Sequence, residues 1–350
     1  MKKNFVTFLI LFIFFLMLAL PSVTKQAAND GLNLWIFTVL PALLPYTIIS
    51  SLLMQLNAFS APCRFIGRIL KRKLPENEIF TIICGCLCGC PIGAKISADL
   101  YKSCKITKRR AEFLMCAFNN ISPSFLINYV FVEIYAPIIS LSSTDKWILY
   151  LIMIVSTVTS ASIVSYIHNN VVCNPNTSKH IIQTNTNQHT IQIKSNHNFT
   201  DKSPFYKNIT ARKNTFSKPT IMSLFDNCIL SAFEIQVKIG GYIILFNIIN
   251  RLFLYTLDLP WLHSSLFGSV MELTSGLGLF ISAPNPPANL SCWLIPAFIT
   301  SLTTFGGLCT IFQTKTVIAD TDLSLSRYAL SRVIACIMSF ILTFIFYYAR

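Results

Sequence analysis

Long apolar stretches, separated by short polar and basic segments, run along most of this chain. Phe5 to Leu20 is almost wholly apolar, and comparable stretches recur to the last residues. Because an α-helix needs about 20 apolar residues to cross a bilayer, the pattern predicts an all-α polytopic membrane protein with about six to eight spans. The expected membrane segments are residues 5–20, 31–57, 79–98, 111–132, 146–167, 221–237 with 238–257, 262–282, 290–312 and 327–348.

One apolar segment, residues 79–98, is interrupted near its centre by small residues and a charge. The interruptions are Gly85, Gly89, Pro91, Gly93 and Lys95. Basic clusters flank the segment at 68–73 and 102–110. The positive-inside rule puts both flanks on the cytosolic face, which predicts a re-entrant hairpin instead of a span. A broken helix with a charge at the break is typical of a transport site.

The second half repeats this pattern weakly. A shift of 218 residues sets Gly89 on Gly307 and Lys95 on Gln313, and Gly306–Gly307 interrupts the apolar segment 290–312. Glycine-broken segments in corresponding places of two halves indicate an inverted-repeat transporter that binds substrate near the bilayer midplane. The expected fold therefore has inverted repeats with two glycine-broken re-entrant helical hairpins.

This reading divides the chain into four parts. Residues 1–30 form an N-terminal transmembrane helix and a polar link, Lys25 to Asp30, and residues 31–167 form the first repeat. Residues 168–220 are rich in Asn, Thr, Lys and His, which predicts a disordered cytosolic loop more than a metal site. Residues 221–350 form the second repeat, in which 284–289 is a Pro/Asn turn.

Composition excludes several classes of function. The net charge is +14, but the basic residues lie in short loops between apolar segments, so membrane topology explains them and no nucleic-acid partner is expected. A P-loop, an H-E-x-x-H motif and a Ser/His/Asp set at membrane depth are all missing from the sequence. The chain is therefore not expected to be an enzyme or to drive transport with ATP.

Cysteine is unusually frequent in the interrupted segment, at Cys84, Cys86, Cys88 and Cys90. On a helix, residues two apart point in different directions, so four such thiols do not converge on one ion unless the segment is unwound. Small-residue helix packing is the favoured interpretation, with no metal or cofactor.

Five stretches together resemble a known family: residues 31–46 (GLNLWIFTVLPALLPY), 89–126 (beginning GCPIGAKISADLYKSC), 239–246 (IGGYIILF), 271–276 (MELTSG) and 305–314 (FGGLCTIFQT). The chain resembles the YlbJ-type sporulation integral membrane proteins of endospore-forming bacteria, which carry nucleoside-recognition (Gate) domains. The resemblance covers about residues 30–165 and 222–350. Where the family commonly has an aromatic residue, this chain has Cys90, which makes the local pocket smaller or softer.

The resemblance implies a fold similar to that of the concentrative nucleoside transporters. Family members look like carriers of dipicolinate, a small aromatic dicarboxylate, from the mother cell toward the forespore. The implied location is the bacterial cell membrane, in sporulating cells the mother-cell-derived outer forespore membrane. A nucleoside-like substrate and a non-transporting role in spore envelope assembly are the alternatives.

The residues expected to bind substrate lie at the two breaks or are polar groups beside them: Gly89, Pro91, Gly93, Lys95, Asn119, Asn120, Ser122, Glu272, Thr274, Gly306, Gly307 and Gln313. Lys95 either binds an anion or reaches the cytosolic face, and Asp99 at i+4 is placed to pair with it. Asn119, Asn120 and Ser122 either hydrogen-bond carboxylates or a ring nitrogen of the substrate or join helices.

The expected partners are a small anionic substrate, the lipid bilayer, a coupling ion (H⁺ or Na⁺) and a second copy of the chain in a homo-oligomer. Glu272 is costly at membrane depth unless it is paired or functional, so it is the candidate for the coupling ion.

Overall fold

The computed structural model describes residues 2–56, 58, 63–65, 68, 74–172, 221–257, 259–281 and 294–349. These residues are helical or irregular, without strands. Within them, five helical stretches are long and apolar enough to cross a membrane: Pro21–Leu53, Ser143–His168, Ile221–Leu257, Leu294–Val317 and Leu325–Tyr348. The chain is a multi-pass membrane protein. Of the predicted loop 168–220, residues 168–172 belong to the helix that ends at Val172, which corrects that boundary, and residues 173–220 lie outside the described residues, as does the predicted turn at 284–289.

The helices follow the same order in both halves. The first half contains α1 (Lys2–Ala19), α2 (Pro21–Asn33), the π-helix η1 (Leu34–Val39), α3 (Leu40–Gln55), α5 (Glu76–Leu87), α6 (Ile92–Lys102), α7 (Lys108–Phe118), α8 (Pro123–Phe125), the π-helix η2 (Leu126–Tyr135) and α9 (Ser143–Val172). The second contains α11 (Ile221–Leu257), α12 (Trp261–Met271), α13 (Leu273–Ile281), α14 (Leu294–Phe305), α15 (Gly307–Val317) and α16 (Leu325–Tyr348).

Four named parts describe this order. In each half, a long helix (α3 or α11) precedes two short helices that pack together, which we call the first helix pair (α5–α6) and the second helix pair (α12–α13). A helix with a break follows: the first broken helix is α7, α8 and η2, and the second is α14 and α15. Each half ends in a long helix, α9 or α16.

This order corrects the register of the predicted repeat. The first helix pair turns at Gly89, but the second turns at Glu272, whereas Gly306–Gly307 is the break inside the candidate span Leu294–Val317. The shift of 218 residues therefore aligns the turn of a helix pair with the break of a broken helix, because apolar segments align with one another easily. That each pair enters and leaves the membrane on one face stays a prediction.

Two further boundaries differ from the prediction. The expected polar link, Lys25–Asp30, lies inside α2, because small residues let α2 pack directly on α11. Ala27 is fully buried there, and its carbonyl accepts a hydrogen bond from Asn247 Nδ2 at 2.7 Å. Residues 221–257 form one helix without interruption. A Cβ on Gly240 would lie 2.5 Å from the Trp35 ring, so this glycine serves close packing and not a break.

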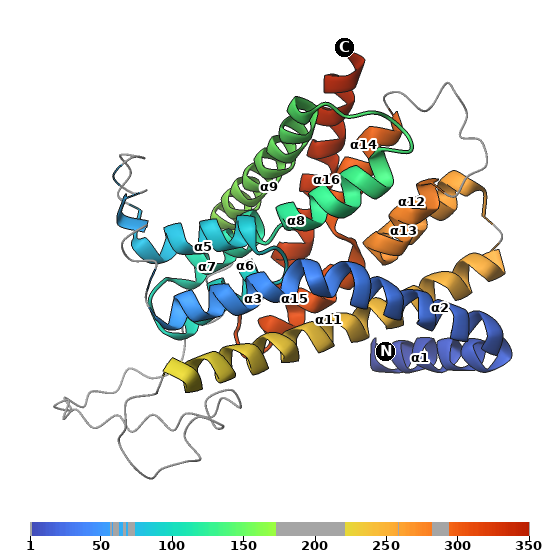
Figure 1. The fold of residues 1–350 in the computed structure, drawn as a ribbon, viewed down its shortest axis with the longest axis horizontal. Coiled ribbons are helices and arrows are strands. Elements are labelled where there is room, and N and C mark those ends of the chain that lie inside the picture. Colours follow the sequence, from blue (N-terminus) through green and yellow to red (C-terminus); the bar gives the residue numbers. More distant parts are fainter. Residues whose placement is uncertain are drawn as a thin grey trace, which may run out of the picture.

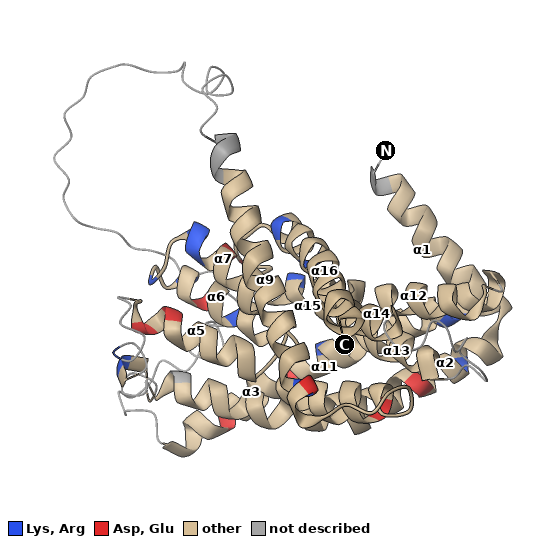
Figure 2. Ribbon diagram, turned by 90° about the horizontal axis from the view of Figure 1, so that it is seen from above, with Lys and Arg blue, Asp and Glu red and all other residues tan. Residues whose placement is uncertain are grey.

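The long helices lie in two directions. Figure 1 shows α3 and α11 side by side across the molecule, with α9, α14 and α16 crossing them steeply as a second group. Figure 2 shows charged residues around the ends of α5, α6 and α7, and few along α1, α9 and α14. Figure 1 shows the first helix pair toward one side of the molecule and the second toward the other, with α15 between them.

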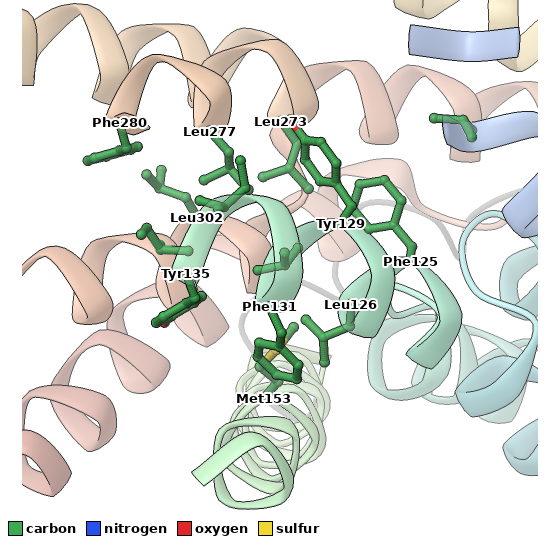
Figure 3. Close-up of a cluster of buried hydrophobic side chains, with 14 of the residues drawn as sticks. Phe125, Leu126, Tyr129, Phe131, Tyr135, Met153, Leu273, Leu277, Phe280 and Leu302 are labelled. Carbon is green, nitrogen blue, oxygen red and sulfur yellow. The ribbon is translucent and has the colours of Figure 1, made fainter. Parts of the chain in front are cut away.

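The main hydrophobic core joins the two halves. Side chains of η2 pack against α13 and α14 of the second half and against α9 (Figure 3). Two buried tyrosines of η2 also form hydrogen bonds to the second half: the Tyr129 hydroxyl donates to the Thr274 carbonyl at 2.6 Å, and the Tyr135 hydroxyl donates to the Pro296 carbonyl at 2.8 Å. The first broken helix is therefore held by the second half of the chain as well as by its own half.

Charged contacts link the halves at one end of the molecule. Glu112 is buried, and its carboxylate pairs with Arg327 and accepts from the Ser324 N–H at 3.0 Å. On the surface nearby, Lys108 Nζ lies 2.8 Å from Asp322 Oδ2, and this ammonium lowers the pKa of the Asp322 carboxyl. Such an exposed pair contributes little to stability, but Glu112 is costly to leave unpaired.

Glycines let the broken helices approach the helix pairs. Gly89 has φ +85° and Gly307 has φ +77°, backbone conformations that residues with a side chain rarely adopt. A Cβ on Gly89 would lie 2.8 Å from Ser122 Cβ, in the first break, and one on Gly307 would lie 3.2 Å from Leu273 N, at the second helix pair. In each half, a turn and a break are therefore in contact.

Gly276→Ala is expected to destabilise the protein by about 1–3 kcal/mol, the cost typical of overpacking. A Cβ at this position would lie 1.9 Å from Ser269 N, so α12 and α13 would have to separate. Gly241→Ala is the matched control, because a Cβ there meets no atom within 4 Å. Thermal melting of the detergent-solubilised protein makes the comparison, and equal melting temperatures for the two variants would contradict the packing argument.

Candidate functional site

A cavity of about 70 Å³ lies where the two halves meet. Its walls come from both helix pairs, both broken helices, η1, α3 and α11. This volume holds a few water molecules. The lining residues are Val39, Leu43, Cys90, Ile121, Ser122, Phe125, Ile239, Ile243, Glu272, Leu273, Thr274, Cys309, Thr310 and Gln313.

The N-terminal ends of four half-helices face this cavity. Cys90 lies just before α6, Ser122 is the N-cap of α8, Thr274 is in the first turn of α13 and Cys309 is in the first turn of α15. Helix N-termini carry partial positive charge and unpaired backbone N–H groups, which favour anions. The described lining residues include no lysine or arginine, so any attraction for an anion there comes from the backbone.

Glu272 is the charged side chain of this lining, and it is 3% exposed. It separates α12 from α13, with extended backbone geometry (φ −137°, ψ 118°). Its Oε1 accepts from Thr274 N at 3.1 Å and its Oε2 from Ser275 N at 2.7 Å. The carboxylate thus caps the N-terminus of α13, which offsets the cost of its burial. Its predicted role with a coupling ion stays a prediction.

Asn119 is a buried link between the halves and does not line the cavity. It is the C-cap of α7, and its Oδ1 accepts from the Ala94 N–H at 3.1 Å. Its Nδ2 lies 3.1 Å from Thr314 Oγ1, 3.0 Å from the Tyr328 hydroxyl and 3.3 Å from Cys90 Sγ. These contacts are of the helix-joining kind. Through its contact with Cys90, Asn119 also touches a residue of the cavity wall.

Of the two neighbouring polar residues, Asn120 joins helices and Ser122 lines the cavity. Asn120 Nδ2 donates to Thr157 Oγ1 at 3.1 Å, and the Asn120 side chain also contacts Arg332, so it joins α9 and α16. Ser122 Oγ accepts from the Phe125 N–H at 3.2 Å and lines the cavity. Of the three polar residues at the first break, Ser122 is therefore the one placed to meet a solute.

Lys95 lies in α6 and is not among the described lining residues. Its Nζ is 3.3 Å from Asp99 Oδ2, which confirms the predicted i,i+4 pair. The side chain of Lys95 is 19% exposed, so the pair lies near the surface of the helix group. An anion at Lys95 would therefore bind beside the cavity and not inside it.

The remaining predicted residues shape the site. Pro91 is the N-cap of α6, and its carbonyl accepts from Lys95 N at 3.0 Å. A Cβ on Gly93 would lie 2.3 Å from the Phe118 carbonyl oxygen, so this glycine permits contact between α6 and α7. Gly306 has φ +82° and begins α15, while Gln313, 8% exposed, lines the cavity.

Sequence reasoning missed one buried cation, Arg332 in α16, which is 3% exposed. Its guanidinium donates to the carbonyls of Asn119 at 2.8 Å and Cys116 at 3.2 Å, and it lies 4.8 Å from the centre of the Tyr328 ring. A signal was present, because an arginine inside an apolar segment is functional by default.

The four thiols of the cysteine-rich segment do not converge as a group, although those of Cys84 and Cys88, one helical turn apart, are in hydrogen-bond contact. Cys84 and Cys86 lie within α5, Cys88 caps its C-terminus and Cys90 lies beyond the turn. Among the residues described, no three His, Cys, Asp or Glu side chains are grouped so as to hold a metal ion.

Comparison with known proteins agrees with the membrane character of the fold. The sporulation integral membrane protein YlbJ of Bacillus subtilis (strain 168) is 25% identical over 332 residues, which cover 93% of this chain and 68% of that protein. The comparison confirms the YlbJ-type resemblance. No family model matches the chain, and no solved structure matches it. The predicted similarity to the concentrative nucleoside transporters therefore stays a prediction.

Asn119→Leu is expected to destabilise the protein by about 3 kcal/mol, because a buried N–H and two hydroxyl groups lose a partner. Asn128→Leu is the control: this asparagine is exposed on η2 and contacts Ser124 Oγ at 3.3 Å, so its change is expected to stay within about 0.5 kcal/mol. Melting in detergent measures both variants. Similar losses at the two positions would show that the Asn119 contacts do not hold the halves together.

Proposed function

We propose that this chain is a secondary membrane carrier of a small aromatic carboxylate, with dipicolinate as the leading substrate. The observation that carries the proposal is the cavity between the two repeats, faced by the N-termini of four half-helices. Discontinuous helices whose N-terminal ends converge at a repeat interface are the way carriers bind anionic groups without a lysine or arginine.

The chemistry of the lining suits a flat ring with carboxylates at its edge. One wall is apolar and offers contact for a ring: Val39, Leu43, Phe125, Ile239 and Ile243. Ser122, Thr310 and Gln313 supply hydroxyl and amide donors beside the helix ends. Dipicolinate combines an aromatic ring with two carboxylates, and the similarity to a sporulation protein supports a role in moving it toward the forespore.

Loading such a solute requires movement. The cavity of about 70 Å³ has room for a few waters, which is less than a six-membered ring with two carboxylates occupies. We infer that the helix pairs act as gates, so that each opens the cavity to one side of the membrane in turn. Movement is passive or coupled to an ion in this proposal, because the sequence contains no P-loop with which to use ATP.

A nucleoside-like solute is the second candidate, and Glu272 favours it. A carboxylate in the lining accepts hydrogen bonds from sugar hydroxyls and repels an anion. Gln313 pairs equally well with a neutral base. The two candidates therefore differ in the charge that the cavity must accept.

Uptake of labelled dipicolinate into liposomes that hold the purified protein tests the proposal. Saturable uptake is expected, and Gln313→Leu is expected to lower it about tenfold at low substrate concentration, the effect of one lost hydrogen bond. Gln26→Leu is the matched control, since Gln26 is exposed on α2 and is not among the described lining residues. Absence of saturable uptake by folded protein would overturn the dipicolinate proposal.

Two further arms locate the site and identify the class of solute. Lys95→Ala is expected to keep uptake, because Lys95 is not in the described lining. If Lys95→Ala abolished uptake and Gln313→Leu did not, the anion would bind at α6 and not in the cavity. Competition by an excess of unlabelled uridine separates the candidates, since a nucleoside carrier would be blocked and a carboxylate carrier would not.

A further inference from the structure

Arg332 is a buried cation without a buried anion beside it. Among the described residues, its hydrogen-bond acceptors are three backbone carbonyls and one side-chain amide oxygen, with no carboxylate. Its Nε is buried and has no hydrogen-bond partner there. A guanidinium in an apolar interior is costly unless its surroundings supply negative charge.

The surroundings do supply it, from the ends of two half-helices. Cys116 and Asn119 lie at the C-terminal end of α7, and Arg332 Nη2 donates to both carbonyls, at 3.2 Å and 2.8 Å. Thr304 lies one residue before the end of α14, and its carbonyl is 3.4 Å from Nη1. Each C-terminus carries about half a negative charge, so together they balance about one positive charge.

This oxygen set matches the sites at which carriers hold a coupling cation. Unwound carbonyls and the C-terminal ends of half-helices coordinate Na⁺ in transporters with broken helices. The same type of oxygens surrounds Arg332: the carbonyls of Cys116, Asn119 and Thr304 and the side-chain oxygen of Asn120, 3.0 Å from Nη1. The partial negative charge of two helix C-termini in this set balances a single positive charge.

We propose that Arg332 is a tethered cation that permanently fills a monovalent-cation site between the two helix breaks, so that transport by this chain needs no sodium. That transport needs no sodium rests on the proposed function, whereas the occupation of the cation site by Arg332 does not. The guanidinium also acts on the cavity through a neighbour. Asn119 accepts from Arg332 through its carbonyl and contacts Cys90, in the cavity wall, through its amide.

Replacing the side chain tests the occupied site without any transport measurement. Arg332→Ala is expected to lower the melting temperature in choline chloride by several degrees, and millimolar guanidinium or Na⁺ is expected to restore much of the loss. Arg251→Ala is the matched control, because this arginine is half-exposed and pairs with Asp30 at 3.4 Å on the surface. Its melting temperature is expected not to change with these cations. Arg332→Gln, which keeps an amide donor, serves where the alanine variant does not fold.

The wild-type protein supplies the second measurement. Its melting temperature, and its dipicolinate uptake where uptake occurs, are expected to be the same in sodium and in choline. Stabilisation of the wild type by Na⁺, or a folded Arg332 variant whose melting is indifferent to every added cation, would overturn the proposal. Uptake without sodium dependence supports both proposals, and missing uptake with cation rescue of the variant's melting rejects the carrier and keeps the tethered cation.

Discussion

The structure depends on how two broken helices satisfy the backbone groups that their breaks release. A helix that stops in an apolar interior leaves carbonyls at one end and N–H groups at the other. Here the carbonyl ends of α7 and α14 converge on the guanidinium of Arg332, and the N–H ends of α8 and α15 face the cavity. The carbonyl ends thus meet the buried cation, whereas the N–H ends meet the cavity.

Glu272 satisfies the opposite kind of helix end: its negative charge meets backbone N–H groups, as the positive charge of Arg332 meets carbonyls. Its carboxylate occupies the N-terminus of α13, and Ser122 Oγ and Asn119 Oδ1 each accept an N–H at the N-terminal ends of α8 and α6. A solute that carries carboxylates therefore meets the Glu272 carboxylate at α13 and, at α15, an N-terminus without a side-chain cap. While Glu272 caps α13, its negative charge favours a neutral solute in the cavity over an anion. A cavity that accepts an anion would need Glu272 to leave that position.

Much of the fold followed from the sequence, because its elements are set by local apolar length and by glycine. The membrane class, the break at Gly89 and the i,i+4 pair of Lys95 and Asp99 could all be read directly. The register of the repeat could not, because a glycine at a turn and a glycine at a break look alike in apolar sequence. Arg332 also escaped, since its role depends on carbonyls that come together through the fold, from α7 and α14.

The contact between α12 and α13 restricts how these two helices can move relative to each other. At Gly276 the two backbones touch, without a layer of side chains between them. Helices separated by side chains slide past one another through small changes of rotamer, but helices in backbone contact have nothing to rearrange. The second helix pair must therefore move as one rigid piece, and Glu272, at the joint between its helices, travels with it.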